Sequence, residues 1–485
     1  MAPGSAPPRR PVPLWLLPVL WTVALGLWGL SREDSLWRDE AATWQAAQRS
    51  PAGLRLLLEH VDVVHGCYYL LMHGLFTCFG AGTTTLRLPS VLAMAMAAAC
   101  VTTVGHRLGG ARTGLAAGMA LGLLPAVQFH LQEGRPYALV AAGAGLSTLL
   151  LVTALQGPVR TRTWVAYGGT VALTGWLNWL SLLLLAAHLT TLLWVRPGRG
   201  TGWRWALASA AATAGVLPLI LVSRDQSGQV AWIPPLSWHL LIGPAVLLAI
   251  GGACALLERP RGSRLSVAAV GLPLLAVPQT CLIAVSLVKP LFLDRYVLFG
   301  MLGLALLIGT AVDAAVRAAV PRFPGAAKWL LPAVVVTAVL ALLPESLAMR
   351  SPASRVDDVL AVAADVRRMK PDGSAVLFLP SDRRDTAVVT PDAFTGLRDI
   401  ALVRGPEEYG NFRGVEARAA DLRTAMLAER HIVLVTDATG AARAAVTEQD
   451  KTKMSVLRSH FTPVADRQVR GRRVTLYERT APPSP

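Results

Sequence analysis

The chain has 485 residues, of which 53% are hydrophobic and only 16% are charged, and its formal net charge is +16. Soluble globular proteins carry about 25% charged residues, so this composition excludes an ordinary soluble enzyme, and it is far too apolar for a disordered chain. Apolar runs of about 20 residues recur along the sequence, which is the length that crosses a bilayer as a helix. The composition therefore predicts a membrane protein with many spans.

The positive charge does not indicate a nucleic-acid partner. Before position 346 there are 24 basic and 12 acidic residues, and after it there are 22 and 18. Most of the excess therefore lies between the apolar runs, where basic loop residues set the orientation of a membrane protein. We expect membrane lipid around the chain and no nucleic acid bound to it.

Eleven apolar segments are predicted to span the membrane, and the first is expected to be retained rather than cleaved as a signal peptide. They lie at about 13–30, 88–105, 113–129, 138–155, 163–178, 180–195, 204–222, 239–257, 266–288, 296–314 and 328–345. Residues 1–345 are therefore predicted to form a membrane domain.

Residues 66–80 are apolar enough to resemble a further span. Counting them as a span would place the arginine-rich loops that follow on the outer side, whereas a helix at the membrane interface leaves those loops inside. With Arg9 and Arg10 inside as well, 15 of the 24 basic residues of the membrane domain face the cytoplasm and 10 of its 12 acids face outward. The positive-inside rule therefore predicts an interfacial helix within a long first outer loop, residues 31–87.

An odd number of spans places residues 346–485 on the same side as the first outer loop. This tail has a soluble composition, in which short apolar runs at 375–379 and 431–435 alternate with a helix-like pattern at 357–369. Such alternation is typical of α/β domains. We predict a small extracytoplasmic α/β domain at residues 346–485.

Charged and aromatic residues of the predicted outer face gather beside the ends of spans. Carboxylates with arginines at this depth suit transfer of a group from a lipid phosphate, because a carboxylate accepts a proton from a hydroxyl and guanidinium groups bind the departing phosphate. The same residues also fit solvated loop charges or interfacial anchors. The groups are Arg38, Asp39 and Glu40; Gln132, Glu133, Arg135 and Tyr137; and Asp294, Arg295 and Tyr296.

His65, Tyr69 and His73 recur at helical spacing within the interfacial segment. The two histidines are about 12 Å apart along a helix, so they cannot share a metal ion without other ligands. We expect a polar helix face here. The sequence predicts no cofactor and leaves a divalent metal open without indicating one.

Five segments occur in a fixed order along the membrane domain, and together they resemble a known family. They are Leu36-Trp37-Arg38-Asp39-Glu40, the apolar helix that starts near His65, Leu86-Arg87-Leu88-Pro89-Ser90, Gly105-His106-Arg107-Leu108-Gly109-Gly110 and Gln132-Glu133-Gly134-Arg135-Pro136-Tyr137-Ala138. The pattern resembles the C-type (GT-C) glycosyltransferases of family 39 type, related to protein O-mannosyltransferases and aminoarabinose transferases. The resemblance covers residues 14–300 and the later spans loosely, and it does not cover the C-terminal domain.

The resemblance implies a GT-C membrane fold with a catalytic base in the first outer loop and arginines that bind the phosphate of a polyprenyl-phosphate sugar. Asp39 would be the base and Glu40 its catalytic neighbour. Donor-phosphate binding would fall to Arg135 and Arg295, with Arg87 also supporting the outer loop. The remaining site residues implied are Tyr137 and Tyr296 beside the phosphate, and Gln132, Glu133 and His65 as supports.

Two departures from the family pattern bear on the substrate. The family often has His-Pro-Pro where this chain has His65-Gly66-Cys67. A histidine common between the fifth and sixth spans is absent, and Leu177-Asn178-Trp179 stands there. The second departure bears on which sugar and which acceptor are used.

The resemblance implies a multi-pass glycosyltransferase of the plasma membrane that moves mannose or a similar monosaccharide from polyprenyl phosphate to an extracytoplasmic hydroxyl, with inversion. The acceptor would be a protein or a cell-envelope glycan. A secondary transporter or lipid-linked-sugar flippase is the main alternative, but transporters place ionisable residues near the bilayer midplane, whereas the acids here map to loops and span ends. An inactive relative that scaffolds an envelope complex is the third interpretation.

Overall fold

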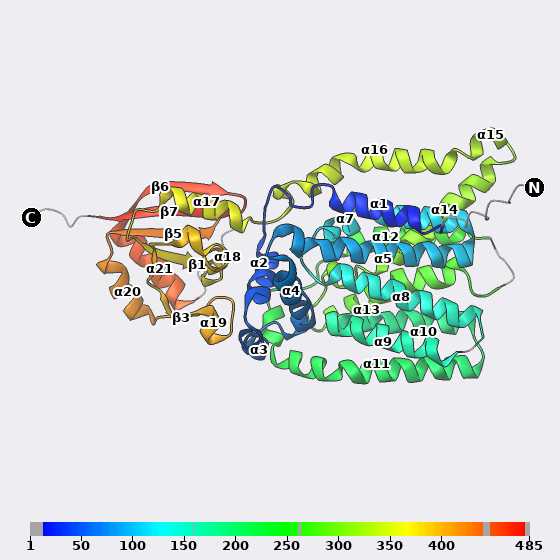
Figure 1. Cartoon of the computed structure of the whole chain (residues 1–485), viewed down its shortest axis with the longest axis horizontal. Helices are drawn as coiled ribbons and strands as arrows, with labels where there is room; N and C mark the ends of the chain where they lie inside the picture. The colour runs from blue at the N-terminus through cyan, green and yellow to red at the C-terminus, as the bar shows by residue number, and fades with distance from the viewer. Residues whose placement is uncertain (1–12, 159, 260–262, 440–446, 481–485) are drawn as a thin grey trace, which may run out of the picture.

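The computed structural model describes residues 13–158, 160–259, 263–439 and 447–480. A bundle of helices and a smaller domain built around a sheet lie end to end, and a layer of short helices lies between them (Figure 1). Arg9 and Arg10, which helped to orient the first predicted span, lie outside the described residues. The apolar runs of the sequence form the bundle, and the soluble-like tail forms the smaller domain.

Each of the eleven predicted spans is mainly helical, although several begin or end elsewhere than predicted. Helix α5 begins five residues before its apolar run, because the segment around Arg87 continues the helix although it is too polar to score as a span. The bundle consists of α1 (Leu16–Leu27), α5 (Thr83–Gly109), α6 (Ala111–Leu123), α7 (Pro125–Leu131), α8 (Tyr137–Gln156), α9 (Thr161–Leu177), η2 (Trp179–Leu182), α10 (Leu183–Val195), α11 (Arg199–Asp225), η3 (Ser227–Val230), α12 (Trp238–Leu256), α13 (Val267–Ser286), η4 (Asp294–Val297), α14 (Gly300–Ala319), α15 (Pro324–Ala327) and α16 (Leu330–Arg350).

The predicted total of eleven spans is not confirmed. Among the described residues, seven helices are long and apolar enough to cross a membrane, and α6 with α7 makes an eighth if this pair, bent by 64°, is one span. Helix α1 and the η2–α10 segment are apolar but shorter, and α9 has 17 residues. Hydropathy locates these helices, but it does not distinguish a full crossing from a shorter one.

Close packing in the bundle depends on small residues where helices cross. A Cβ atom on Gly105 of α5 would lie 2.9 Å from the Cα atom of Gly114 in α6, and one on Gly303 of α14 would clash with the carbonyl oxygen of Gly271 in α13. Small residues let membrane helices approach closely, and van der Waals packing then holds them. These crossings hold α5 against α6 and α13 against α14.

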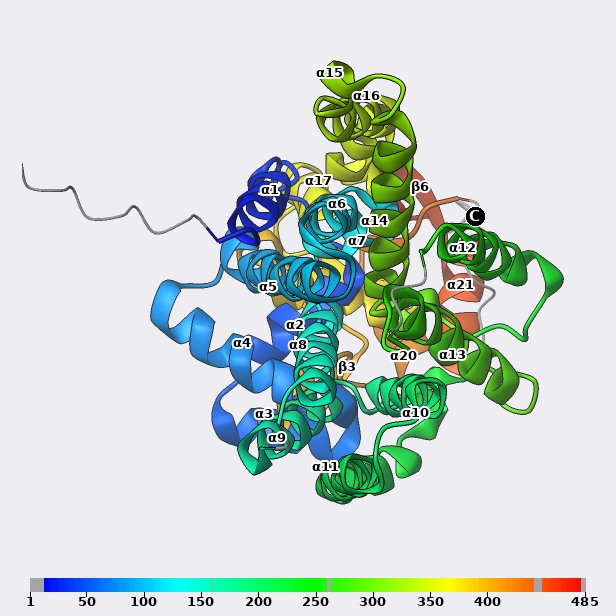
Figure 2. The same ribbon diagram turned by 90° about the vertical axis from the view of Figure 1, so that its right-hand side faces the viewer.

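The first predicted outer loop forms a layer at one end of the bundle. It contains α2 (Arg38–Gln48), α3 (Pro51–His60), η1 (Val63–His65) and α4 (Gly66–Phe79). In Figure 2, α4 is seen from the side while α5, α6 and α11 are seen end-on, so α4 lies across the end of the bundle. This orientation agrees with the predicted interfacial helix rather than a further span.

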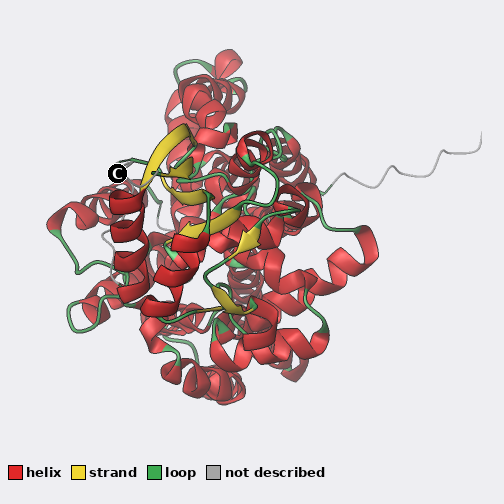
Figure 3. Ribbon diagram, turned by 90° about the vertical axis from the view of Figure 1, so that its left-hand side faces the viewer, coloured by secondary structure: helices red, strands yellow, loops and turns green. Residues whose placement is uncertain are grey.

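The smaller domain follows α16, which ends at Arg350, five residues beyond the predicted boundary. Figure 3 shows its strands with helices around them. Its elements are η5 (Pro352–Ser354), α17 (Val359–Met369), β1 (Ala375–Leu379), η6 (Ser381–Arg384), α18 (Asp385–Val389), η7 (Pro391–Phe394), β2 (Arg398–Asp399), β3 (Leu402–Arg404), α19 (Pro406–Tyr409), β4 (Val415–Glu416), α20 (Ala419–Ala428), β5 (His431–Asp437), α21 (Glu448–His460), β6 (Phe461–Val469) and β7 (Arg472–Arg479).

The main sheet has five strands in the order β2-β1-β5-β7-β6. Strands β2, β1 and β5 are parallel, with Leu377 opposite Leu434, and β7 runs antiparallel to β5 and to β6. Alternate residues of β1 enter two different cores, Phe378 in one and Leu377 in the other. The sheet is therefore covered on both faces, and the predicted α/β fold of the tail is confirmed.

Candidate active site

The first turn of α2 carries Asp39 at the junction between the bundle and the smaller domain (Figure 1). The Asp39 side chain is 24% exposed, and its Oδ2 lies 3.0 Å from Nη1 of Arg295. An acidic residue in the first turn of a helix is favoured by the helix dipole. The Asp39 carboxylate is therefore fixed by an ion pair with Arg295 and is still accessible to solvent.

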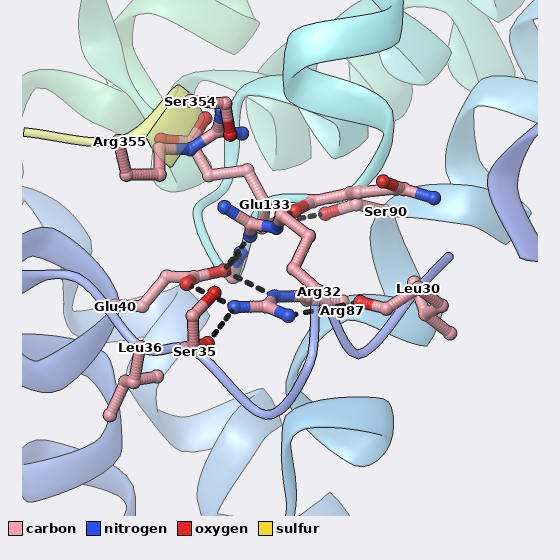
Figure 4. Close-up of polar contacts among 12 residues, drawn as sticks. Leu30, Arg32, Ser35, Leu36, Glu40, Arg87, Ser90, Glu133, Ser354 and Arg355 are labelled. Carbon is pink, nitrogen blue, oxygen red and sulfur yellow. Dashed lines mark hydrogen bonds and ion pairs between the residues drawn. The ribbon is translucent and has the colours of Figure 1, made fainter. Parts of the chain in front are cut away.

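Glu40, the neighbour of Asp39, is fully buried. Its carboxylate pairs with Nη2 of Arg87 at 2.7 Å and with Nη2 of Arg32 at 3.1 Å, and it accepts a hydrogen bond from the amide of Gly134 at 3.0 Å (Figure 4). Burial alone would raise the pKa of Glu40, but Arg87 and Arg32 outweigh it and lower the pKa to about 2. The expected catalytic role of Glu40 is therefore corrected: a substrate does not reach this carboxylate, which ties the loop to the bundle.

Arg87 is also corrected as a phosphate ligand. A guanidinium group has five N–H donors, and the Arg87 side chain makes five hydrogen bonds, to both oxygens of Glu40 and to the backbone carbonyls of Leu30, Ser31 and Ser35 (Figure 4). The side chain has no exposed surface. Arg87 therefore supports the outer loop, as expected in part, and has no donor left for a phosphate.

Arg135 lies beside Asp39 at the start of α8. Its Nη1 lies 3.4 Å from the backbone carbonyl oxygen of Asp39 and 3.4 Å from the hydroxyl of Tyr69, and its Nη2 lies 3.1 Å from Nε2 of His65. Its Nε is buried and makes no hydrogen bond within the described part of the chain. Buried N–H groups are rarely left without a partner, so this nitrogen is an unused donor on a guanidinium group that contacts Asp39.

Asp62 and His65 form a hydrogen-bonded dyad that contacts Arg135. Nδ1 of His65 lies 2.6 Å from Oδ1 of Asp62, and the hydroxyl of Tyr69 donates to the other oxygen of Asp62. Burial and the positive charge of Arg135 lower the pKa of His65 despite Asp62. The neutral imidazole therefore carries its proton on Nδ1 and accepts from Arg135 at Nε2, so it orients the guanidinium group.

Arg295, in η4, approaches Asp39 from the other side of the site. Its guanidinium carbon lies 5.7 Å from the ring centres of both Tyr137 and Trp232 and 5.9 Å from that of Tyr296, within the range of cation–π attraction. Like that of Arg135, its Nε is buried and makes no hydrogen bond among the described residues. The two predicted tyrosines thus surround Arg295 with aromatic surface.

Gln132 and Glu133 support the loop between α7 and α8 from inside the protein. Nε2 of Gln132 donates to the carbonyl oxygens of Gly26 and Trp28 at 2.8 and 2.7 Å. Glu133 pairs with His130, and its carbonyl oxygen accepts from Ser90 at 2.6 Å. Both residues are buried, and their contacts hold the backbone that leads to Arg135.

Sequence reasoning did not find Arg32 or Trp232. Arg32 precedes Glu40 by eight residues and carries no local signal, and Trp232 belongs to a loop that only the fold brings over Arg295.

His73 bonds to the backbone of Ala47 and does not contact Asp62 or His65 in the hydrogen bonds of the described residues. No group of three metal-ligating side chains occurs among the described residues. Asn178 caps η2, because its side-chain oxygen accepts a hydrogen bond from the amide of Leu180 at 3.0 Å.

A mainly apolar cavity of about 410 Å³ lies beside η4, between the ends of α7, α12, α13 and α14. Its apolar lining includes Leu247 and Met301, and its polar lining includes Gln279, whose Oε1 is buried and makes no hydrogen bond among the described residues. Leu293 and Asp294, which precede Arg295, also line it. An apolar space therefore begins directly next to the arginine that contacts Asp39.

No protein-family model and no curated protein matches the chain. Solved structures do match. ArnT from Cupriavidus metallidurans in the apo state aligns with a TM-score of 0.62 at 14% identity, over 95% of this chain and 97% of that chain. The same protein bound to undecaprenyl phosphate aligns with a TM-score of 0.57 at 13% identity, with the same coverage.

The archaeal oligosaccharyltransferase AglB from Archaeoglobus fulgidus, in complex with an inhibitory peptide and a dolichol-phosphate, aligns with a TM-score of 0.50 at 10% identity. That alignment covers 87% of this chain and 69% of AglB. The predicted GT-C fold is confirmed, and the ArnT alignment extends over the C-terminal domain, which the sequence resemblance did not reach.

Proposed function

We propose that this protein is a membrane glycosyltransferase that moves a monosaccharide, mannose or a similar neutral sugar, from a polyprenyl phosphate to a hydroxyl group outside the cytoplasm. The observation that carries the proposal is that Arg135 and Arg295 both contact Asp39, Arg135 at its backbone carbonyl and Arg295 at its partly exposed carboxylate. A base and two guanidinium groups at the end of an apolar bundle suit this reaction and few others.

In the proposed reaction, Asp39 accepts the proton of the acceptor hydroxyl as its oxygen attacks the anomeric carbon. The bond between that carbon and the phosphate oxygen breaks, and polyprenyl phosphate leaves with the bonding electrons. Arg135 and Arg295 stabilise the charge that develops on this phosphate, as fixed donors do in a site shielded from water. Direct displacement of this kind inverts the anomeric configuration. Asp39 then loses its proton to solvent.

The lipid donor is supported by three observations. The unpartnered Nε atoms of Arg135 and Arg295 offer directional donors to a phosphate oxygen. The cavity beside η4 offers apolar surface for the first isoprene units. ArnT and AglB, which share the fold, were solved with undecaprenyl phosphate and dolichol-phosphate respectively. We propose the same class of carrier here, with a protein or envelope glycan as acceptor.

The orientation proposed is a plasma-membrane protein with its site and C-terminal domain outside. The loop layer and the C-terminal domain lie at the same end of the bundle (Figure 1). The loop charges predict this arrangement, because they place both the first outer loop and the C-terminal domain on the side of the membrane opposite the basic loops. The sugar is then transferred at the outer face.

A transporter or flippase is less well supported. His188 of α10 is an ionisable side chain inside the bundle, but Tyr167 and Thr148 bond to its two ring nitrogens at 2.8 and 3.1 Å. A proton or substrate path needs ionisable groups that face a cavity or one another. His188 fits a satisfied neutral residue instead. An inactive scaffold differs from the enzyme only in lacking turnover, which the next experiment measures.

The proposal is tested with purified protein in nanodiscs, given undecaprenyl-phosphate mannose with a radiolabelled sugar and native envelope fractions as acceptors. We expect the label to move from the organic-soluble lipid to protein or glycan, with release of undecaprenyl phosphate. A Glu59→Gln variant, altered on the exposed face of α3, serves as the control and should transfer normally. Absence of transfer with this donor and with other neutral-sugar donors would reject the proposed enzyme.

A further inference from the structure

The C-terminal domain turns the carboxyl end of its parallel strands toward the membrane domain. Helix α18 follows β1 and packs on α2, and Figure 1 shows it between the sheet and α2. In α/β domains this edge of the sheet is the usual place for a ligand. Here the edge faces the helix that carries Asp39.

Helix α2 lacks a cap of its own. Its N-cap residue is Trp37, whose side chain accepts no hydrogen bond from the helix, so the first amides of α2 need partners from elsewhere. Asp357 supplies one, because its Oδ1 accepts a hydrogen bond from the amide of Arg38 at 3.0 Å. Arg38 is the first residue of α2, and Asp39 is the second. The cap therefore comes from a residue 319 positions further along the chain.

Asp358 bonds to the loop segment that leads into α2. Its Oδ1 accepts from the amide of Leu36 at 3.3 Å, and the amide of Val359 donates to the carbonyl oxygen of Leu36 at 2.7 Å. Its Oδ2 lies 2.7 Å from Nη1 of Arg470. Asp357 and Asp358 therefore accept hydrogen bonds from the backbone amides on both sides of Trp37.

Asp357 is itself held by a buried arginine. Its Oδ2 accepts from Nη2 and Nε of Arg472 at 3.0 and 3.2 Å. Arg472 is fully buried, and its Nη2 also lies 2.6 Å from Oδ2 of Asp385, in α18. The Asp357 carboxylate therefore has one oxygen fixed by the C-terminal domain and the other bonded to α2.

We propose that Asp357, fixed by Arg472, is a positioning residue for Asp39: the C-terminal domain caps α2 and so sets where the carboxylate of the base lies. The capping part rests on geometry alone, and the effect on catalysis rests on the proposed function. The C-terminal domain is then a working part of the site, although none of its residues contacts substrate in the proposed reaction.

The test is Asp357→Asn in the full-length protein. An amide has a single acceptor oxygen, which can serve Arg38 or Arg472 but not both. We expect the amide of Arg38 to exchange with deuterium about tenfold faster or more, since it loses a fixed partner. The amide of Leu36 keeps its bond to Asp358. With the labelled undecaprenyl-phosphate mannose, we expect kcat to fall about tenfold to a hundredfold, because a misplacement near 1 Å costs about that much. The KM for this donor should change little.

Glu416→Gln is the matched control. Glu416 is a carboxylate of the same domain that pairs with the buried Lys453 at 2.7 and 2.8 Å and with Arg384 at 2.9 Å, both within that domain. Its loss should lower stability comparably while leaving kcat and the exchange of residues 36–38 unchanged. If Asp357→Asn does not fold, Arg472→Lys, which keeps the charge but loses the two-pronged contact, is measured in the same way.

The outcomes are distinct. Unchanged exchange at the Arg38 amide in a folded variant overturns the proposed cap, whatever the activity. Faster exchange with an unchanged kcat overturns the positioning role. An equal fall in kcat for Glu416→Gln also overturns it, because the effect would then follow stability rather than position. If the wild type transfers no sugar, the proposed function fails, while the exchange measurement still decides the cap.

Discussion

Arg295 Nη1 lies 3.0 Å from Oδ2 of Asp39, although 256 residues separate them in the sequence. Arg135, from a third loop, reaches the backbone carbonyl of the same aspartate. One aspartate thus contacts two guanidinium groups from distant parts of the sequence, Arg295 through its carboxylate and Arg135 through its backbone carbonyl. The proposed mechanism depends on this convergence, because one group accepts a proton while the others hold the leaving phosphate.

Replacing Arg135 or Arg295 by lysine should weaken use of the lipid donor. Lysine keeps the charge but loses the planar pair of donors that matches a phosphate. Hydrogen bonds to charged groups contribute about 1.5–3 kcal/mol, so we expect KM for the labelled undecaprenyl-phosphate mannose to rise about tenfold or more in each variant. Initial rates at varied donor concentration measure the change.

The matched control for these two variants is Arg55→Lys, because the Arg55 side chain is 84% exposed and pairs with the exposed Glu59. Exposed ion pairs contribute little, so donor use should be that of the wild type. Donor KM values equal to wild type in both Arg135→Lys and Arg295→Lys would show that these arginines are interfacial anchors and not phosphate ligands.

Glu40→Gln should destabilise the protein rather than act on chemistry directly. The substitution leaves Arg87 and Arg32 buried without their counter-charge, and breaking a buried pair in this way costs about 3–5 kcal/mol. We expect a clear fall in the thermal unfolding midpoint in detergent at neutral pH. Glu59→Gln, on an exposed carboxylate, should leave that midpoint within the error of the wild type.

The stability difference between wild type and Glu40→Gln should depend on pH. The pKa of Glu40 is lowered to about 2 in the folded protein, so its contribution is fully present above the unfolded pKa, about 4.3, and is lost as the pH falls toward about 2. The difference between the unfolding midpoints should therefore be constant above about pH 5 and should narrow, without vanishing, as the pH is lowered to 3. A difference that stays constant down to pH 3 would contradict the assigned ion pair.

Topology can be tested with single cysteines. Ser50 and Thr424 are exposed residues of the loop layer and of the C-terminal domain, and we expect cysteines at both positions to react with an impermeant maleimide on intact cells. The native cysteines are first replaced, since Cys78 is itself exposed. A cysteine at Arg162, on a predicted inner loop, should react only after lysis. Reaction of all three sites only after lysis would reverse the orientation.

The sequence carried enough information for the helices and for the general location of the site. Runs of apolar residues are long-range features of the chain, so the eleven helical segments, the transverse helix α4 and the α/β tail followed from pattern and loop charge. The convergence of Arg135 and Arg295 followed from their shared position just before the ends of spans. These inferences needed no knowledge of side-chain contacts.

The directions of side chains and the long-range backbone contacts could not be predicted from the sequence. Asp39 and Glu40 are adjacent, and consecutive helical residues point about 100° apart, so the sequence could not tell which carboxylate is buried. The environment of Glu40 depends on Arg32, which no motif marks. The cap that Asp357 places on α2 joins segments 319 residues apart, and no local pattern reports such a contact.

The central claim is that Asp39 is the base of a sugar transfer from a lipid carrier. It is tested most directly by comparing envelope glycoproteins and glycans by mass spectrometry in a strain lacking the gene, complemented with wild type or Asp39→Asn. Asparagine keeps the volume of the side chain but accepts no proton, and loss of a general base costs about 10²–10⁴-fold. We predict a hexose-bearing product that wild type restores and that the correctly folded Asp39→Asn protein does not. Full restoration by Asp39→Asn, or glycans that do not differ between the deletion and the wild type, would contradict the claim.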